Sequence, residues 1–251
     1  MLRVDKHGAA RLLTLNDPKR RNLLSGDLCR AISAAVAEAN ADPDAKVIVI
    51  TGAPPAFCAG ANLDDLEQAA GGETDTLHAV YNSFMDVAQS ALPTIAAVNG
   101  PAVGAGLNLA LACDMRLASA DALFDCRFLK IGLHPGGGHS WMLQRAVGWA
   151  HAARMLLFNR PMGAEEAKSV GLVQDVFDAD ALVAEALTLA RRTEGLPRDL
   201  IERAKRTMTL ASASSHRAAF EHESEEQMHS LQQPPFQELV ARLKGELAAK
   251  P

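Results

Sequence analysis

The hydrophobic positions of the first 178 residues alternate between short, almost wholly apolar runs and stretches in which apolar residues recur at helical spacing. The short runs predict strands that are buried on both faces. They lie at residues 11–16, 46–51, 94–98, 115–118 and 173–177. The predicted helices cover residues 28–39, 77–91, 104–113, 136–147 and 150–158, with Ser25 as the cap of the first. The pattern therefore predicts an α/β core whose sheet is covered on both sides.

The remainder of the chain, from residue 179 onward, is helical in pattern throughout. A Gly-Leu-Pro sequence at 195–197 interrupts it, and a charged helix begins at about Phe236. We therefore divide the chain into an α/β core over 1–178 and a C-terminal helical region over 179–251, which is either an appended helical lobe or an oligomerisation region.

Charge and composition narrow the range of partners. The 251 residues contain 25 Lys and Arg against 30 Asp and Glu, a formal net charge of -5, which gives no general attraction to nucleic acid or anionic lipid. Aromatic residues make up only 4%, too few for base-stacking platforms. We expect no nucleic-acid partner.

The cysteines and the apolar runs bear on location. The four cysteines form no Cys-x-x-Cys pair and lie in apolar stretches, as expected of reduced core thiols in a cytoplasmic protein. The first eight residues lack the features of a secretory signal. The long apolar run at 94–113 contains asparagines, a proline and three glycines, so we expect no membrane span.

Two loops, at 52–61 and 99–106, each join a buried strand to a run of small residues. Small residues let a ligand approach the backbone. The second loop ends at Gly104 and Ala105, where the first free N–H groups of a helix would face an anionic oxygen. Two such donors on one carbonyl oxygen would form an oxyanion hole; the alternative is close packing of helix against strand.

Several other motifs are absent. Leu109 stands where a dinucleotide fingerprint needs glycine or alanine, and there is no Gly-Lys-Ser/Thr phosphate loop. The stretch 138–142 lacks the final glycine of a nucleophile elbow. His216, His222 and His229 do not share one helix face, so no metal site is predicted.

Five ordered blocks of the sequence resemble the crotonase, or enoyl-CoA hydratase/isomerase, superfamily. They are residues 17–25 (DPKRRNLLS), 47–63 (ending AFCAGANL), 97–106 (AVNGPAVGAG), 124–148 and 164–173. The resemblance implies a spiral of ββα units, a helical C-terminal region that builds homotrimers or hexamers, and a fatty acyl-CoA or enoyl-CoA substrate. It implies no metal or redox cofactor, because coenzyme A enters as part of the substrate.

Carried onto this chain, the resemblance makes the backbone N–H groups of Ala61 and Ala105 the oxyanion donors. Ala59 would lie against the adenine, and the basic turn at 19–21 would either meet coenzyme A phosphates or remain solvated. The residues expected along coenzyme A are Lys19, Arg20, Arg21, Ala59, Gly60 and Leu63.

Both positions of the usual catalytic glutamates differ here, as they hold Asn108 and Phe128. Neither side chain exchanges a proton at neutral pH, and a positioned acid or base contributes about 10²–10⁴-fold in rate. We therefore expect hydration to be severely weakened. Asn62 replaces the family's usual aspartate, a change expected to be structural.

Substitutes for the glutamates must come from nearby titratable residues. His134, before the triple glycine at 136–138, is the first candidate, and Asp125 is another unless it pairs with Arg127 or Arg116. Weaker candidates are His139, Asp64 and Asp65.

The resemblance makes this chain a nominal enoyl-CoA hydratase of fatty acid metabolism. Two alternatives remain open: a non-catalytic acyl-CoA carrier that keeps the pocket, or a family isomerase or other acyl-CoA enzyme that uses His134 or Asp125. A purely structural protein is disfavoured. The stretch between Asp64 and Leu77, which would shape the acyl pocket, has no readable pattern.

Overall fold

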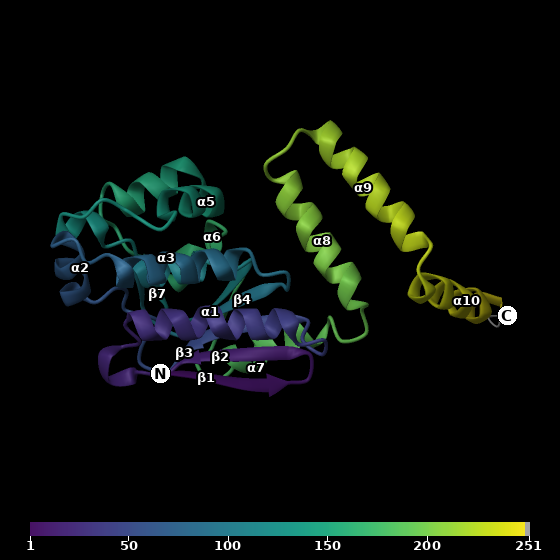
Figure 1. Cartoon of the computed structure of the whole chain (residues 1–251), viewed down its shortest axis with the longest axis horizontal. Helices are drawn as coiled ribbons and strands as arrows, with labels where there is room; N and C mark the ends of the chain where they lie inside the picture. The colour runs from purple at the N-terminus through teal and green to yellow at the C-terminus, as the bar shows by residue number, and fades with distance from the viewer. Residues whose placement is uncertain (249–251) are drawn as a thin grey trace. The chain divides into compact units, whose positions relative to one another are not determined.

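The computed structural model describes residues 1–248, and the chain forms two compact units, Met1–Glu194 and Gly195–Pro251 (Figure 1). The first unit contains both sheets. The second is wholly helical over its described residues. Each unit is described on its own.

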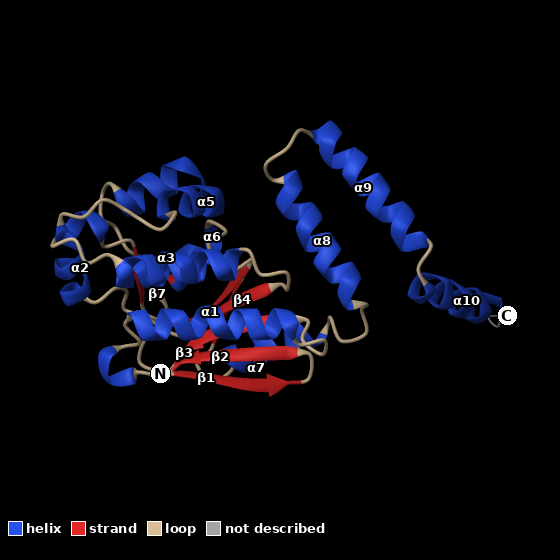
Figure 2. Ribbon diagram, viewed as in Figure 1, coloured by secondary structure: helices blue, strands red, loops and turns tan. Residues whose placement is uncertain are grey.

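A six-stranded sheet with the order β1-β2-β3-β4-β6-β9 forms the centre of the first unit (Figure 2). Its strands are β1 (Leu2–His7), β2 (Ala10–Leu15), β3 (Val47–Gly52), β4 (Thr94–Val98), β6 (Met115–Ser119) and β9 (Asp175–Phe177). Only β1 is antiparallel to its neighbour. The predicted strands are all present, each shifted by at most two residues, whereas β1 was not predicted because its alternating residues are largely exposed.

Alternate residues of the central strands face two separate hydrophobic clusters. On β3, Ile48 and Ile50 belong to the larger cluster, while Val47 and Val49 belong to the smaller one. All six residues of β2 and of β3 are buried, so each strand contributes to both clusters. Burial of one such aliphatic side chain contributes about 1.5–3 kcal/mol, which explains why the sheet is the predictable part of the fold.

The helices of the first unit cover both faces of this sheet. They are α1 (Gly26–Ala41), α2 (Leu63–Ala70), α3 (Asp75–Ala88), α4 (Ala105–Ala112), α5 (His139–Leu156), α6 (Ala164–Ser169) and α7 (Leu182–Arg191). Ser25 caps α1 as predicted, its hydroxyl accepting from Leu28 N–H at 3.3 Å. Gly148, with φ of +73°, divides α5 into two helical segments.

The stretch between Asp64 and Leu77 contains α2, which the sequence pattern did not reveal. Asn62 is its N-cap, and its side chain accepts from Asp64 N–H at 3.3 Å. Asparagine and aspartate are both good N-caps, so the replacement of the family's aspartate keeps this structural role.

A second, three-stranded sheet, β5 (Ala102–Val103), β7 (Leu123–Asp125) and β8 (Met162–Gly163), was also not predicted. Its strands are two or three residues long, too short to show a period-two pattern. Together the two sheets and their helices form the α/β core.

The boundary of the first unit lies later than the sequence predicted. Leu182, Ala186 and Ala190 of α7 are buried in the smaller cluster against the sheet. Because α7 packs on the core, the compact unit ends at Glu194 and the boundary set after residue 178 was too early.

The second unit consists of α8 (Arg198–Ala211), α9 (His216–Leu231) and α10 (Pro234–Ala248). Arg203 on α8 pairs with Glu226 on α9 at 2.9 Å. Large apolar side chains such as Phe220 and Met228 are exposed on α9. The predicted role of this region in trimer formation stays a prediction.

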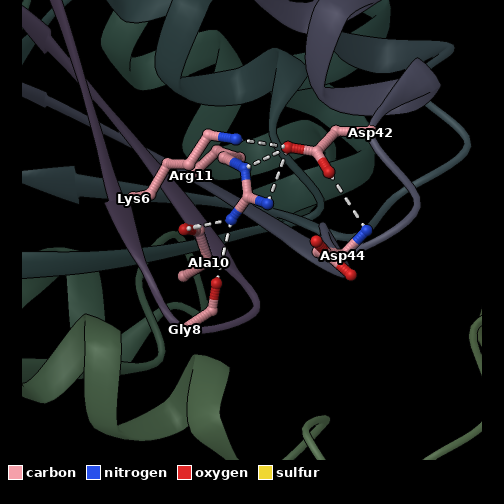
Figure 3. Close-up of polar contacts among 6 residues, drawn as sticks. All are labelled: Lys6, Gly8, Ala10, Arg11, Asp42 and Asp44. Atoms are coloured by element: carbon pink, nitrogen blue, oxygen red, sulfur yellow. Dashed lines mark hydrogen bonds and ion pairs between the residues drawn. The ribbon is translucent and has the colours of Figure 1, made fainter.

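Arg11 at the start of β2 connects the first hairpin to the C-terminal end of α1 (Figure 3). Its buried guanidinium donates to Asp42 Oδ2 at 2.8 Å and to the carbonyls of Gly8 and Ala10 at 2.9 and 3.0 Å. Lys6 Nζ also donates to Asp42, at 3.0 Å. Hydrogen bonds from Arg11 and Lys6 hold the pKa of Asp42 well below its ordinary value.

We predict that Asp42→Asn lowers the Tm at pH 7, because the buried Arg11 loses its counter-ion. The matched control is Asp5→Asn, which removes the exposed pair with Arg3 and should change the Tm little. The lowered pKa means that the Asp42 contribution is present above the unfolded-state pKa of about 4 and is lost as the pH falls below it. Thermal melts of both variants from pH 7 to pH 3 test this; equal Tm losses at pH 7 would contradict it.

Candidate active site

The two loops of small residues lie side by side, joined by backbone hydrogen bonds. Cys58 N–H donates to Pro101 O at 3.1 Å, and Val103 N–H donates to Cys58 O at 3.0 Å. A Cβ on Gly106 would collide with the Cys58 carbonyl, so glycine is required for this approach. The sequence analysis assigned the small residues of these loops to ligand access. They also allow α4 to pack closely against the first loop.

Asn22 fixes the turn that precedes α1 against the first loop. This wholly buried side chain donates through Nδ2 to Ala53 O and Ala56 O, both at 2.8 Å, and accepts from Asp17 N–H at 2.9 Å. Ala59 N–H donates to Arg21 O at 3.0 Å. Sequence reasoning gave Asn22 no role of its own, although its φ of +56° is one that asparagine adopts more readily than most residues.

A cavity of about 540 Å³ opens beside these loops. Its wall combines the two loops with α2, α3, α4 and the segment that follows β7. The residues that line it include Ala59, Gly60, Ala61, Leu63, Asp64, Tyr81, Ala105, Asn108, Arg127, Phe128, His134 and Gly136.

Ala61 and Ala105 line this cavity from its two loops. A Cβ on Gly60, whose φ is +98°, would lie 2.6 Å from Val103 O and 3.6 Å from Ala105 N, which shows how closely the loops approach. Within residues 1–248, no protein acceptor is hydrogen-bonded to either the Ala61 or the Ala105 N–H. Ala105 is the first residue of α4, where an amide has no partner in its own helix.

Asn108 is buried at the cavity wall and held by two hydrogen bonds. Its Nδ2 donates to Gly136 O at 2.8 Å, and its Oδ1 lies 2.6 Å from His139 Nδ1. Because an amide oxygen only accepts, His139 Nδ1 carries the proton. One N–H of the Asn108 amide is left over, so Asn108 offers the cavity a hydrogen-bond donor.

His139 lies behind Phe128, with ring centroids 4.8 Å apart at an interplanar angle of 61°. Burial lowers the pKa of His139 to about 4, so the ring is neutral at pH 7. Its Nε2 has no hydrogen-bond partner in the described part of the chain. Asn108 and Phe128, which the resemblance places at the glutamate positions, thus both contact the neutral imidazole of His139. His139 does not line the cavity itself.

The other titratable candidates are in different positions. His134 lines the cavity, and its Nδ1 lies 2.8 Å from Pro135 O, which leaves Nε2 as the ring nitrogen available to a ligand. Asp125 does not line the cavity; its carboxylate pairs with Arg127 at 2.7 Å, the salt-bridge alternative considered from the sequence. Asp64 lines the cavity as well, whereas Asp65 does not.

The residues expected along coenzyme A fall into two groups. Ala59, Gly60 and Leu63 line the cavity. The basic turn at 19–21 is exposed and does not line it, although the Arg21 carbonyl bonds to Ala59. Arg20 pairs with Asp17 at 2.6 Å. Arg127, which the sequence suggested only as a partner of Asp125, is a cation that does line the cavity.

Two other features are absent from the described part of the chain. Residues 1–248 contain no group of three or more His, Cys, Asp or Glu side chains placed to hold a metal ion. None of the helices in that range has the length and apolar character needed to cross a membrane.

We predict that His139→Gln changes how stability depends on pH. The folded-state pKa of about 4 lies below the unfolded value of about 6.5, so the unfolded chain binds a proton first and wild-type stability falls as the pH drops between them. The neutral variant lacks this loss, which amounts to at most about 1.4 kcal/mol per pH unit.

Urea unfolding at pH 7, 6, 5 and 4.5 measures the difference between wild type and His139→Gln. Its control is His216→Gln, which removes an exposed imidazole from the second unit. Parallel stability profiles for wild type and His139→Gln would show that His139 is not held neutral by the fold.

Known proteins are similar in sequence to this chain over most of its length. The family model described as enoyl-CoA hydratase/isomerase matches residues 5–245. The chain is 46% identical over 243 residues to the probable enoyl-CoA hydratase EchA14 of Mycobacterium tuberculosis, covering 94% of this chain and 93% of that one. It is 37% identical over 189 residues to the mitochondrial methylglutaconyl-CoA hydratase of Rattus norvegicus, covering 72% of this chain and 59% of that one.

Solved structures of enoyl-CoA hydratases are similar to this chain in fold. An enoyl-CoA hydratase from Polaromonas sp. JS666 superposes with a TM-score of 0.91 at 30% identity, covering 98% of this chain and 97% of that chain. A probable enoyl-CoA hydratase/isomerase from Mycobacterium abscessus gives a TM-score of 0.88 at 32% identity, covering 98% and 96%. The resemblance seen in the five sequence blocks is confirmed, and the chain belongs to the enoyl-CoA hydratase/isomerase family.

Proposed function

We propose that this chain binds a fatty acyl-CoA or enoyl-CoA thioester in the 540 Å³ cavity and hydrates enoyl-CoA slowly. The observation that supports this most directly is the pair of unpartnered N–H groups of Ala61 and Ala105 on two adjoining loops. Both would donate to the thioester oxygen, on which negative charge develops as the substrate becomes an enolate.

The position of Ala105 favours this role. It begins α4, so its N–H lies at the positive end of the helix dipole. The apolar side chains around the cavity limit access of water, which strengthens the interaction between these donors and a developing oxyanion. Ala59, Gly60 and Leu63 would contact the coenzyme A moiety, and no resident cofactor is needed for this chemistry.

Weak hydration follows from the side chains at the two glutamate positions. Hydration requires a base to activate water and an acid to deliver a proton to the α-carbon. Asn108 and Phe128 do neither. His134 lines the cavity, and we assign its imidazole the proton transfer that remains.

A second candidate function is acyl-CoA binding without turnover. The observation in its favour is that Asn108 is fixed by Gly136 and His139 while Phe128 covers His139. In this arrangement neither glutamate position holds a group that transfers a proton. The choice between the two functions depends on His134.

The proposal includes three further expectations that come from the family resemblance. They are a homotrimer or hexamer built through the C-terminal helices, a place in fatty acid metabolism and a cytoplasmic location. An isomerase that uses His134 is compatible with the same cavity, whereas the Asp125 salt bridge argues against that carboxylate as the acid or base.

We predict that Ala105→Pro strongly lowers the turnover of crotonyl-CoA, because proline has no N–H to donate. Loss of one oxyanion donor costs about 10²–10³ in rate. Loss of the enoyl absorbance measures turnover, and circular dichroism establishes folding. Ala105→Gly keeps the N–H and is the matched control; turnover by folded Ala105→Pro equal to that of the control would refute the assignment.

We also predict that Asn108→Glu with Phe128→Glu raises crotonyl-CoA hydration, by about 10²-fold or more, because it supplies both missing proton-transfer groups. The matched control is Asn108→Gln with Phe128→Leu, which introduces no carboxylate. If the wild type binds crotonyl-CoA without turnover, the acyl-CoA carrier is the correct function. Rapid wild-type hydration would instead mean that His134 fully replaces the glutamates.

A further inference from the structure

We infer that Tyr81 is a specificity-determining residue that selects acyl-CoA thioesters carrying a second oxygen on the acyl chain. This inference rests on the proposed function of the cavity. It concerns the only tyrosine of the chain, which the sequence pattern did not single out.

Tyr81 reaches the cavity wall from α3 and lies against the glycine turn before α5. A Cβ added to Gly136 would fall inside van der Waals contact with the Tyr81 hydroxyl oxygen. A Cβ on the next residue, Gly137, would lie 3.0 Å from Asn108 Nδ2. The phenol and the Asn108 amide therefore contact adjacent residues of one turn, and the absence of side chains at both glycines leaves room for them there.

The Tyr81 hydroxyl has no partner within the protein. No hydrogen bond or ion pair within residues 1–248 engages it. The cavity that Tyr81 lines also carries apolar side chains, among them Leu66, Val80, Phe84 and Ile131. A ligand oxygen in this cavity would supply the hydroxyl with a hydrogen-bond partner.

Asn108 makes this part of the cavity a site for an acceptor. Its Oδ1 is occupied by His139 Nδ1–H and one Nδ2 hydrogen by Gly136 O, so its remaining group is a donor. The Tyr81 hydroxyl can donate as well. A carbonyl oxygen can accept from these donors, whereas a methylene group accepts from neither.

The oxygen that these donors bind lies beyond the thioester carbonyl. Asn108 follows Ala105 by three residues on α4, so the two lie about 5–6 Å apart on one helix face. If the Ala105 N–H holds the thioester oxygen, then the Asn108 and Tyr81 donors face the next atoms of the acyl chain. The ligand class is therefore an oxygenated acyl thioester such as a 3-oxoacyl-CoA.

The test compares acetoacetyl-CoA with butyryl-CoA, which differ by one carbonyl oxygen. We expect wild type to bind acetoacetyl-CoA more tightly than butyryl-CoA by isothermal titration calorimetry. Tyr81→Phe keeps the ring and removes only the hydroxyl, and it should reduce this ratio of affinities by roughly three- to tenfold.

The matched control is Met85→Leu, which alters an exposed position of the same helix outside the cavity lining and should leave the ratio at its wild-type value. An equal ratio in wild type and Tyr81→Phe, or no preference in wild type, would overturn the role of Tyr81 while leaving acyl-CoA binding intact. Folded wild type that binds neither thioester would overturn the proposed function, and this inference with it.

Discussion

The candidate site depends on the backbone pairing between Cys58 and the residues around Ala102. These two hydrogen bonds join a loop that follows β3 to a loop that follows β4, and both strands belong to the buried parallel sheet. Because the sheet fixes where each loop begins and the pairing fixes where each ends, Ala61 and Ala105 reach one cavity with free N–H groups. The small residues of the two loops make this approach sterically possible, as the close contact of Gly106 with the Cys58 carbonyl shows.

Asn22 also holds the first of these two loops in place, from the turn that precedes α1. Its amide donates to the carbonyl groups of residues 53 and 56 in a turn between buried elements. Since the basic turn at 19–21 precedes it directly, Asn22 also determines where that turn lies relative to Ala59. The geometry of the proposed coenzyme A end of the site is thus set by a neutral side chain rather than by the lysine and arginines.

Asn108 and Phe128 are both fixed at the wall of the cavity. Asn108 is held by two hydrogen bonds, and Phe128 packs on the ring of His139. The family resemblance implies proton-transferring carboxylates at these two positions. In the proposed function, the remaining N–H of Asn108 therefore favours ligands with acceptor oxygens, and neither side chain activates water.

The family, the strands of the central sheet and most of the helices could be predicted from the sequence. Those features depend on local pattern and on ordered blocks of residues, which a sequence displays directly. Packing was needed to establish that α7 lies on the sheet, that Asp125 pairs with Arg127, and that His139 is buried beside Asn108. Packing also brings Tyr81, 27 positions before Asn108, to the same glycine turn. These contacts join residues far apart or choose among several possible partners, and only the folded chain fixes which of them meet.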